Sequence, residues 1–274
     1  MRVSRSMKWA VLVVLSVVVV VMLVPLLWLV MGAFSYDGTV QGVLPLKATL
    51  ANFNFLAGTT AGIPFWRWLA NSVIVSGAAA VIAVLVDSLA AFGMARIGFA
   101  GSRVVFAVVV SSLSIPFVAT LVPLYLEMSQ LNLLNSYEAL IAPFTASAFG
   151  VFLLYQFFRQ FPREIEEAAR VDGAGFVRIW WRLAVPIAAP AMVTLGIITF
   201  MDAYNDFFWP LVAVSDTDMR TLTVGVAITA IGQFSTNYGE LMALTLLSVI
   251  PMVVVFVVAQ RRLVAGIGTV GTVG

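Results

Sequence analysis

The stretch from Trp9 to Phe34 contains no charged residue and is almost entirely apolar. A helix of this length crosses a hydrocarbon core about 30 Å thick, because each helical residue advances about 1.5 Å. A cleaved signal peptide would have a shorter apolar core and a clear small-residue cleavage site, and this run shows neither. We therefore expect a retained first membrane span.

Apolar runs of similar length recur along the rest of the chain. Of its 274 residues 62% are hydrophobic and 10% are charged, and the mean hydropathy is +1.05. Ordinary soluble domains are roughly half apolar and one quarter charged. The predicted fold class is all-α, a polytopic integral membrane protein whose six transmembrane helices form one domain over residues 1–274. The predicted spans are residues 9–34, 68–95, 104–128, 137–158, 186–211 and 238–258, with outer loops at 36–67, which has a short helix near 50–56, and at 215–237.

Two of these spans contain features that are unusual in a lipid-facing helix. The second carries Asp87, and an ionisable group inside a membrane span is a functional candidate. The simpler interpretation is a carboxylate that faces a wet cavity or bonds a neighbouring helix. The third span contains Pro116 and Pro123 among several hydroxyl side chains. Because an interrupted helix needs protein or a cavity around its free backbone groups, we expect this span to be broken and to line the transport path.

One long polar stretch, residues 162–185, separates the fourth and fifth spans. Pro162 suits the first turn of a helix, and the glutamates after it place negative charge at the positive end of the helix dipole. Gly173 can adopt the left-handed backbone that ends a helix. A second helix with one apolar face is predicted after Gly175. The stretch therefore predicts two short helices joined by a glycine turn.

These residues resemble the cytoplasmic signature of the membrane-spanning permease subunits of binding-protein-dependent ABC importers. That signature is Glu-Ala-Ala, three residues, Gly, nine residues and Ile-x-Leu-Pro. The corresponding residues here are Glu167-Ala168-Ala169, Gly173 and Leu183-Ala184-Val185-Pro186, with conservative departures at Leu183 and Val185. The triplet that begins at Asp172, the segment from Asn205 to Leu211 and the terminal Gln260-Arg261-Arg262 are similar to the carbohydrate branch, in particular its maltose-type, smaller six-helix permease.

The resemblance implies that residues 162–185 are a coupling-helix loop that docks on an ATPase. It also implies three kinds of partner: a second homologous permease, two ATP-binding subunits and an extracytoplasmic solute-binding protein. ATP would be bound by the partner subunits, so no cofactor is expected on this chain. Without the signature, the same loop would be interpreted as an amphipathic hairpin at the membrane surface. The implied coupling residues are Glu167, Ala168, Ala169, Asp172 and Gly173.

The residue types present exclude several other classes of function. The chain has no cysteine and no histidine, which removes thiolate and imidazole metal sites and histidine-based catalytic triads. Its only lysines are Lys8 and Lys47, and no GxxxxGK[ST] phosphate loop occurs, so ATP must be hydrolysed elsewhere. We expect a transport subunit and not an enzyme. A net charge of +2 indicates no nucleic-acid partner.

The sequence therefore predicts a permease subunit of an ATP-driven importer that translocates a carbohydrate delivered by a solute-binding protein. Two alternatives stay open. One is a permease of the same kind for another small solute, for example a glycerol phosphate ester. The other is an ion-coupled secondary transporter, although such proteins often contain internal repeats with paired broken helices and no convincing repeat is visible here.

A polar interruption in the fifth span is the predicted translocation path. If that helix begins at Pro186, Asp202 and Asp206 lie roughly 24 and 30 Å along it, in the outer half of the membrane. Four residues apart they share a helix face, and two carboxylates toward lipid would be costly. Carboxylates suit sugar hydroxyls, and aromatic rings can stack on a sugar face; packing or gating is the alternative role. The candidate path residues are Asp202, Tyr204, Asn205, Asp206 and Trp209.

Positive charge predicts the orientation. With six spans and a cytoplasmic N-terminus, twelve of the fifteen basic residues lie inside, as the positive-inside rule requires. Both termini and the coupling loop are then cytoplasmic, in the cell membrane of a bacterium or archaeon. The inner residues are Arg2, Arg5, Lys8, Arg96, Arg103, Arg159, Arg163, Arg170, Arg178, Arg182, Arg261 and Arg262, and the outer ones are Lys47, Arg67 and Arg220.

Overall fold

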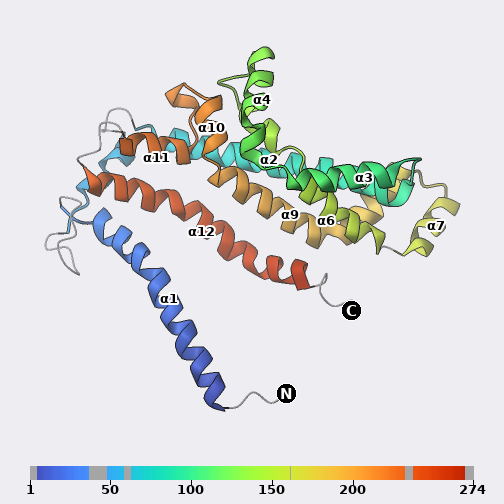
Figure 1. Cartoon of the computed structure of the whole chain (residues 1–274), viewed down its shortest axis with the longest axis horizontal. Helices are drawn as coiled ribbons and strands as arrows, with labels where there is room; N and C mark the ends of the chain where they lie inside the picture. Colours follow the sequence, from blue (N-terminus) through green and yellow to red (C-terminus); the bar gives the residue numbers. More distant parts are fainter. Residues whose placement is uncertain (1–4, 37–47, 59–62, 161, 232–236, 269–274) are drawn as a thin grey trace. The chain divides into compact units, whose positions relative to one another are not determined.

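The computed structural model describes residues 5–36, 48–58, 63–160, 162–231 and 237–268, and these residues are largely helical (Figure 1). The chain divides into two compact units. Unit 1 contains Met1–Trp66 and Gly225–Pro251, and unit 2 contains Arg67–Val224 and Met252–Gly274. An all-α membrane fold is therefore confirmed.

Unit 1 contains α1 (Arg5–Ala33), a 3-10 helix η1 (Ala51–Ala57) and the first part of α12 (Tyr238–Gly268). Most apolar side chains along α1 are exposed, as lipid-facing residues would be, and Ala33 at its end is buried. Asn52 on η1 donates from Nδ2 to the carbonyl oxygen of Ala33 at 2.9 Å. This bond satisfies one of the carbonyls that the end of a helix leaves without a partner. Helices at the first span and near residue 50 are as predicted.

Unit 2 holds most of α2 (Phe65–Phe92), which continues as a π-helix, η2 (Gly93–Ile97). The third span is broken, as the sequence predicted. Its first half, α3 (Ser102–Ser111), leads through η3 (Ser112–Ser114) into α4 (Phe117–Gln130) at an angle of 105°. The break falls at Pro116, which cannot donate a backbone hydrogen bond and disfavours helical backbone in the residue before it.

The fourth span is also broken, and the sequence did not predict this. It consists of α5 (Tyr137–Ile141), η4 (Ala142–Phe144) and α6 (Ala148–Arg159), with a bend of 45°. The side chain of Ser147 accepts a hydrogen bond from the backbone nitrogen of Gly150 at 2.8 Å. Because a serine at this position supplies the first turn of a helix with an acceptor, α6 starts as a new helix.

The fifth span begins earlier and ends earlier than predicted. From α8 (Phe176–Ile179) through the π-helix η5 (Trp180–Ala184) to α9 (Val185–Asn205), the chain is one helix of 30 residues. The wider π register directly before Pro186 accommodates a residue that cannot donate to the preceding turn. The second helix of the predicted hairpin is therefore the start of the membrane span and not a separate segment.

The chain after α9 is more helical than predicted. A short α10 (Phe208–Ala213) follows the end of α9, and the expected outer loop contains η6 (Thr217–Met219) and α11 (Leu222–Ile231). Residues 232–236 of that loop lie outside the described residues. Four described helices are long and apolar enough to cross a membrane, and each bent pair taken as one span raises the count to six.

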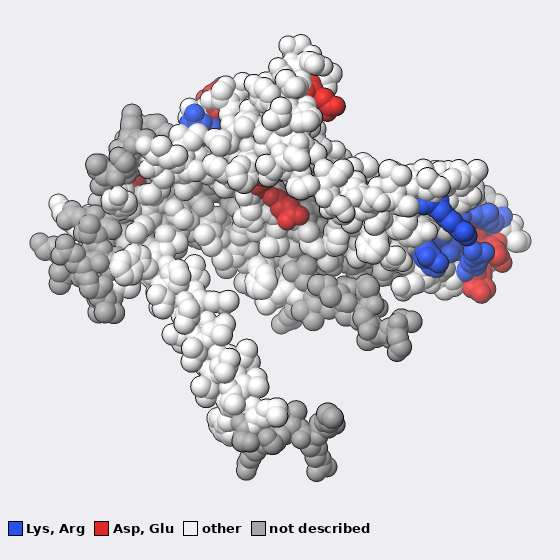
Figure 2. All heavy atoms as spheres, viewed as in Figure 1, with Lys and Arg blue, Asp and Glu red and all other residues white. Residues whose placement is uncertain are grey.

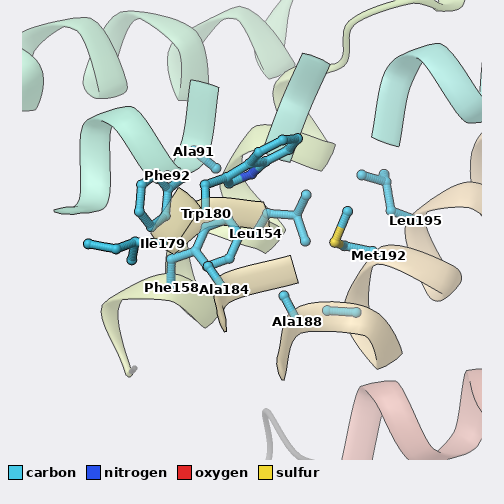
Figure 3. Close-up of a cluster of buried hydrophobic side chains, with 11 residues drawn as sticks. Ala91, Phe92, Leu154, Phe158, Ile179, Trp180, Ala184, Ala188, Met192 and Leu195 are labelled. Carbon is cyan, nitrogen blue, oxygen red and sulfur yellow. The ribbon is translucent and has the colours of Figure 1, made fainter. Parts of the chain in front are cut away.

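One core cluster of unit 2 lies where α2, α6, α8, η5 and α9 meet, as Figure 3 shows. Phe92 and Phe158 pack edge to face with ring centroids 5.6 Å apart. Beside them, Ala184 and Ala188 are buried and present little side chain. Small residues of this kind let membrane helices approach each other closely, so the first turns of α9 pack closely against their neighbours.

Candidate functional site

The predicted coupling loop is built around α7 (Arg163–Val171). Pro162 lies at its N-cap, and Glu164 and Glu166 occupy its first turn, where their negative charge favours the helix dipole. Gly173 has a φ of 78°, the left-handed backbone that the sequence predicted. Gly175 then caps α8. A helix that ends in a glycine turn is therefore confirmed.

Most of α7 is uncovered. The predicted coupling residues Glu167, Ala168, Asp172 and Gly173 are exposed, and Ala169 packs partly against the core cluster. Two apolar side chains are exposed as well, Ile165 by 42% and Val171 by 89%. Apolar side chains that stand among charges on a polar loop fit a surface that another protein covers.

Glu166 is the one buried residue of α7. Its Oε2 accepts a hydrogen bond from Nε of Arg96 at 2.7 Å, and Nη2 of Arg96 lies 2.6 Å from the same oxygen. Arg170, one turn further on, pairs with the other carboxylate oxygen. The side chains of Arg96 and Glu166 are 6% and 7% exposed. A buried ion pair thus attaches α7 to the end of η2.

A polar hollow of about 250 Å³ adjoins this ion pair. Figure 2 shows the basic and acidic side chains gathered at the end of unit 2 that carries α7. The guanidinium of Arg170 also lies 4.5 Å from the ring centre of Phe176, a cation–π contact that joins α7 to α8. The hollow is lined by Ala95, Arg96, Ile97, Arg163, Glu166, Glu167 and Arg170.

A second cavity, of about 350 Å³, lies between the broken fourth span and α9. Asp202 supplies its only ionisable group, and Ser147 and Thr199 supply hydroxyls. Phe144 and Phe149 contribute aromatic walls. The remaining lining residues are Pro143, Ala146, Leu195 and Ile198. This cavity combines acceptors with apolar and aromatic surface, which is the usual lining of a small-molecule site.

The other predicted path residues do not join Asp202 at this cavity. The ring of Tyr204 is buried and stacks on Phe200 at a centroid distance of 5.9 Å. Trp209 is fully buried and donates from Nε1 to the carbonyl oxygen of Ala139 at 2.8 Å. Neither ring offers an open face to a solute in this conformation.

Asn205 and Asp206 act on the backbone at the end of α9. Asn205 donates from Nδ2 to the carbonyl oxygen of Met201 at 2.9 Å, and its side chain is otherwise exposed. Oδ2 of Asp206 accepts from the backbone nitrogen of Trp209 at 3.3 Å, so this carboxylate, one residue before the N-cap Phe207, supplies an acceptor to the first turn of α10. Because α9 ends at Asn205, Asp202 and Asp206 do not lie on one face of a single helix. This corrects the expectation that the two carboxylates share a helix face.

Asp87 lies fully buried in α2 and bonds a neighbouring helix, which is the simpler of the interpretations considered for it. Its Oδ1 accepts from the backbone nitrogen of Ser147 at 3.0 Å, at the start of α6. Its Oδ2 has no hydrogen-bond partner among the described residues. Asp87 therefore fixes the helix end that borders the cavity.

Sequence reasoning missed Arg96 and Glu166 as a functional pair, and it missed Ser147 and Thr199 at the cavity. The spacing of Glu166 and Arg170 is a recognisable helical ion-pair signal. Arg96 lies 70 positions away from Glu166, so only the tertiary structure brings the two together.

Among the described residues the chain is largely helical, with long apolar helices and an uncovered short helix on a polar loop, an architecture that fits a transport permease. Residues 87–269 match the family described as binding-protein-dependent transport system inner membrane component, and the chain belongs to this family. It is a transport subunit and not an enzyme, and it lies in a cell membrane that it crosses several times.

Two relatives and one solved structure show how far the similarity extends. The chain is 31% identical to the arabinooligosaccharides transport system permease protein AraQ of Halalkalibacterium halodurans, over 99% of this chain and 98% of that one. It is 34% identical to the sn-glycerol-3-phosphate transport system permease protein UgpE of Shigella flexneri, over 76% and 74%. A bacterial ABC transporter involved in the import of alginate contains a chain with the same fold, with a TM-score of 0.83, 23% identity and coverage of 95% and 99%.

Proposed function

We propose that this chain is one membrane subunit of an ATP-driven importer for a carbohydrate delivered by an extracytoplasmic solute-binding protein. A second homologous permease completes the membrane part, and two ATP-binding subunits dock on its cytoplasmic side. Membership of a binding-protein-dependent family and the name of the AraQ relative support this assignment. ATP is bound by the partners, since this chain has no phosphate loop.

The uncovered surface of α7 is the observation that carries the proposal. Glu167 and Ala168 are exposed beside Ile165 and Val171, so charge and apolar surface are presented together. The small side chain of Ala168 allows close approach of another protein's groove. When the ATP-binding subunits close, they move this helix, and the α9 region opens outward to receive the solute.

The cavity at Asp202 supports a neutral polyhydroxyl solute. The Asp202 carboxylate can accept hydrogen bonds from sugar hydroxyls, and the hydroxyls of Ser147 and Thr199 can both donate and accept them. Phe149 offers an aromatic ring on which a sugar can stack. A phosphate ester would bring its negative charge toward the Asp202 carboxylate. No lysine or arginine lines this cavity to offset that repulsion. The glycerol phosphate alternative is therefore the weaker one.

The test uses the whole importer, purified with its partner subunits and reconstituted in liposomes with its binding protein. Neutral oligosaccharides should stimulate ATP hydrolysis and enter the vesicles, and sn-glycerol 3-phosphate should not. Stimulation by the phosphate ester alone would contradict the solute class. Uptake that follows an ion gradient and needs no ATP would favour the secondary transporter and contradict the importer.

A further inference from the structure

Glu166 is an unusual residue to bury in α7. It is the helix's one buried side chain, and it is charged. Burying a charge is costly unless it is paired, and removing one partner of a buried pair is far more disruptive than removing an exposed one. The Arg96–Glu166 pair therefore holds α7 in a defined position against η2.

Arg96 belongs to a helix whose other end is held just as specifically. Phe65–Ile97 is a continuous helix of 33 residues. Near its start, Nδ2 of Asn71 donates to the carbonyl oxygens of Asp218 and Arg220 at 2.8 and 2.9 Å. Nε1 of Trp68 donates to the carbonyl oxygen of Thr217 at 2.8 Å. One end of this helix is thus bonded to α7 and the other to the turn at η6.

The span between these two attachments is long and stiff. Asn71 and Arg96 are separated by about 37 Å along a helix that rises about 1.5 Å per residue. Ser72 adds a further bond at the η6 end, where its hydroxyl oxygen accepts from the backbone nitrogen of Leu222 at 2.8 Å. A helix held at both ends transmits a displacement, whereas a loop would absorb it.

We propose that Arg96 and Glu166 are positioning residues that make α2 and η2 a rod between the coupling helix and the turn at Thr217–Met219. Movement of α7 pulls Arg96 through the buried ion pair, and the turn moves with the far end of the rod. Arg170 supports the pair by occupying the second oxygen of Glu166. This inference rests on the proposed coupling role of α7.

The first experiment measures solute imported per ATP hydrolysed in the reconstituted importer. Glu166→Gln and Arg96→Gln should each lower this ratio about tenfold, and the double variant should lower it no further if the two residues act as one unit. Glu164→Gln, an exposed change in the same turn, is the matched control and should leave the ratio unchanged. Losses that multiply in the double variant, or a normal ratio in Glu166→Gln, would overturn the proposal.

The second experiment follows the movement itself. Because the chain contains no cysteine, Val171→Cys and Asp218→Cys together place two spin labels, one on the last residue of α7 and one on the turn. Their separation should be unchanged by ATP in the parent importer and should shift with ATP once Glu166→Gln is added. A shift already present in the parent would contradict a rod.

If Glu166→Gln fails to assemble, the first experiment uses Glu166→Asp and Arg96→Lys, which keep both charges. Each should give an intermediate ratio of solute imported to ATP hydrolysed. Unchanged ratios in both variants would also contradict the rod.

These outcomes are separable from failure of the coupling role. Glu167→Lys changes an exposed side chain of α7 and leaves Arg96, Glu166 and Arg170 in place. If this change abolishes uptake and the Glu166 variants keep a normal ratio, coupling stands and the rod is wrong. If Glu167→Lys leaves uptake normal in an assembled importer, the coupling role itself is wrong.

Discussion

Gly150 shows how a single buried carboxylate restricts its neighbours. A Cβ built on Gly150 would lie 2.0 Å from Oδ2 of Asp87 and 2.9 Å from Cδ1 of Leu195. Asp87 is fully buried and is held through Oδ1 by the backbone nitrogen of Ser147, so its carboxylate cannot withdraw without breaking that bond. Residue 150 must therefore lack a side chain if α6 is to start where Asp87 holds it.

We expect Gly150→Ala to destabilise the protein by about 1–3 kcal/mol, the usual cost of overpacking a well-packed interior. The measurement is the thermal unfolding midpoint in detergent. Gly77→Ala on α2 is the control, because its added Cβ would meet nothing within 4 Å. This control should be neutral or slightly stabilising, since alanine favours helices more than glycine does. Equal midpoints for the two variants would contradict the packing argument.

Asp202 and Asp206 should respond differently to the loss of their charge. Asp202→Asn removes the one ionisable group that lines the cavity. The assay titrates binding protein that is kept saturated with sugar and measures the concentration that gives half-maximal uptake. Because a hydrogen bond to a charged group contributes about 1.5–3 kcal/mol, this concentration should rise roughly tenfold or more. Asp206→Ala removes the acceptor for the backbone nitrogen of Trp209 in the first turn of α10 and should cost about 1 kcal/mol of stability. If Asp202→Asn changes neither the half-saturating concentration nor the maximal rate, Asp202 does not line the path.

At the scale of the helices, the turn after α7 depends on the left-handed backbone of Gly173. An L-residue in this conformation costs roughly 1–2 kcal/mol, and proline cannot adopt it at all. Gly173→Pro should therefore abolish uptake while the protein still inserts in the membrane. Gly58, which has a similar φ of 70° in unit 1, offers a control because Gly58→Pro perturbs a turn far from α7 in the sequence. An abundant, inserted Gly173→Pro variant with normal uptake would contradict the coupling role of this loop.

Helical structure was predictable from the sequence, whereas the breaks within the helices were predicted only in part. Pro116 interrupts the third span because of its own covalent structure. The break before α6 follows Pro143 in η4, a local signal from which the break was not predicted. The start of α6 depends in addition on Ser147 and on its bond to Asp87, 60 positions away. The continuous helix through Pro186 was missed for a related reason, because a π segment can absorb a proline that normally marks a helix start.

At the scale of the whole molecule, the sequence predicted the coupling loop more completely than it predicted the cavity at Asp202. The coupling loop is a contiguous motif, so Glu167 and Gly173 could be recognised directly. The cavity assembles side chains from two distant segments, so only Asp202 of its lining was predicted. Aromatic rings can either stack on a sugar or pack inside the protein, and the sequence does not distinguish these two roles. Tyr204 and Trp209 were expected to stack on a sugar, and the structure buries both rings.

The charge asymmetry between the two sides of the membrane makes a prediction about the whole chain. Twelve of fifteen basic residues lie on the side that carries α7 in a six-span topology, so that side should be cytoplasmic. The absence of cysteine allows single labels, and Val171 is 89% exposed while Asp218 is exposed on η6. In intact cells, a membrane-impermeant thiol reagent should label Asp218→Cys from outside and should label Val171→Cys only after the membrane is opened. The reverse pattern would place α7 outside, where no ATP-binding subunit could reach it.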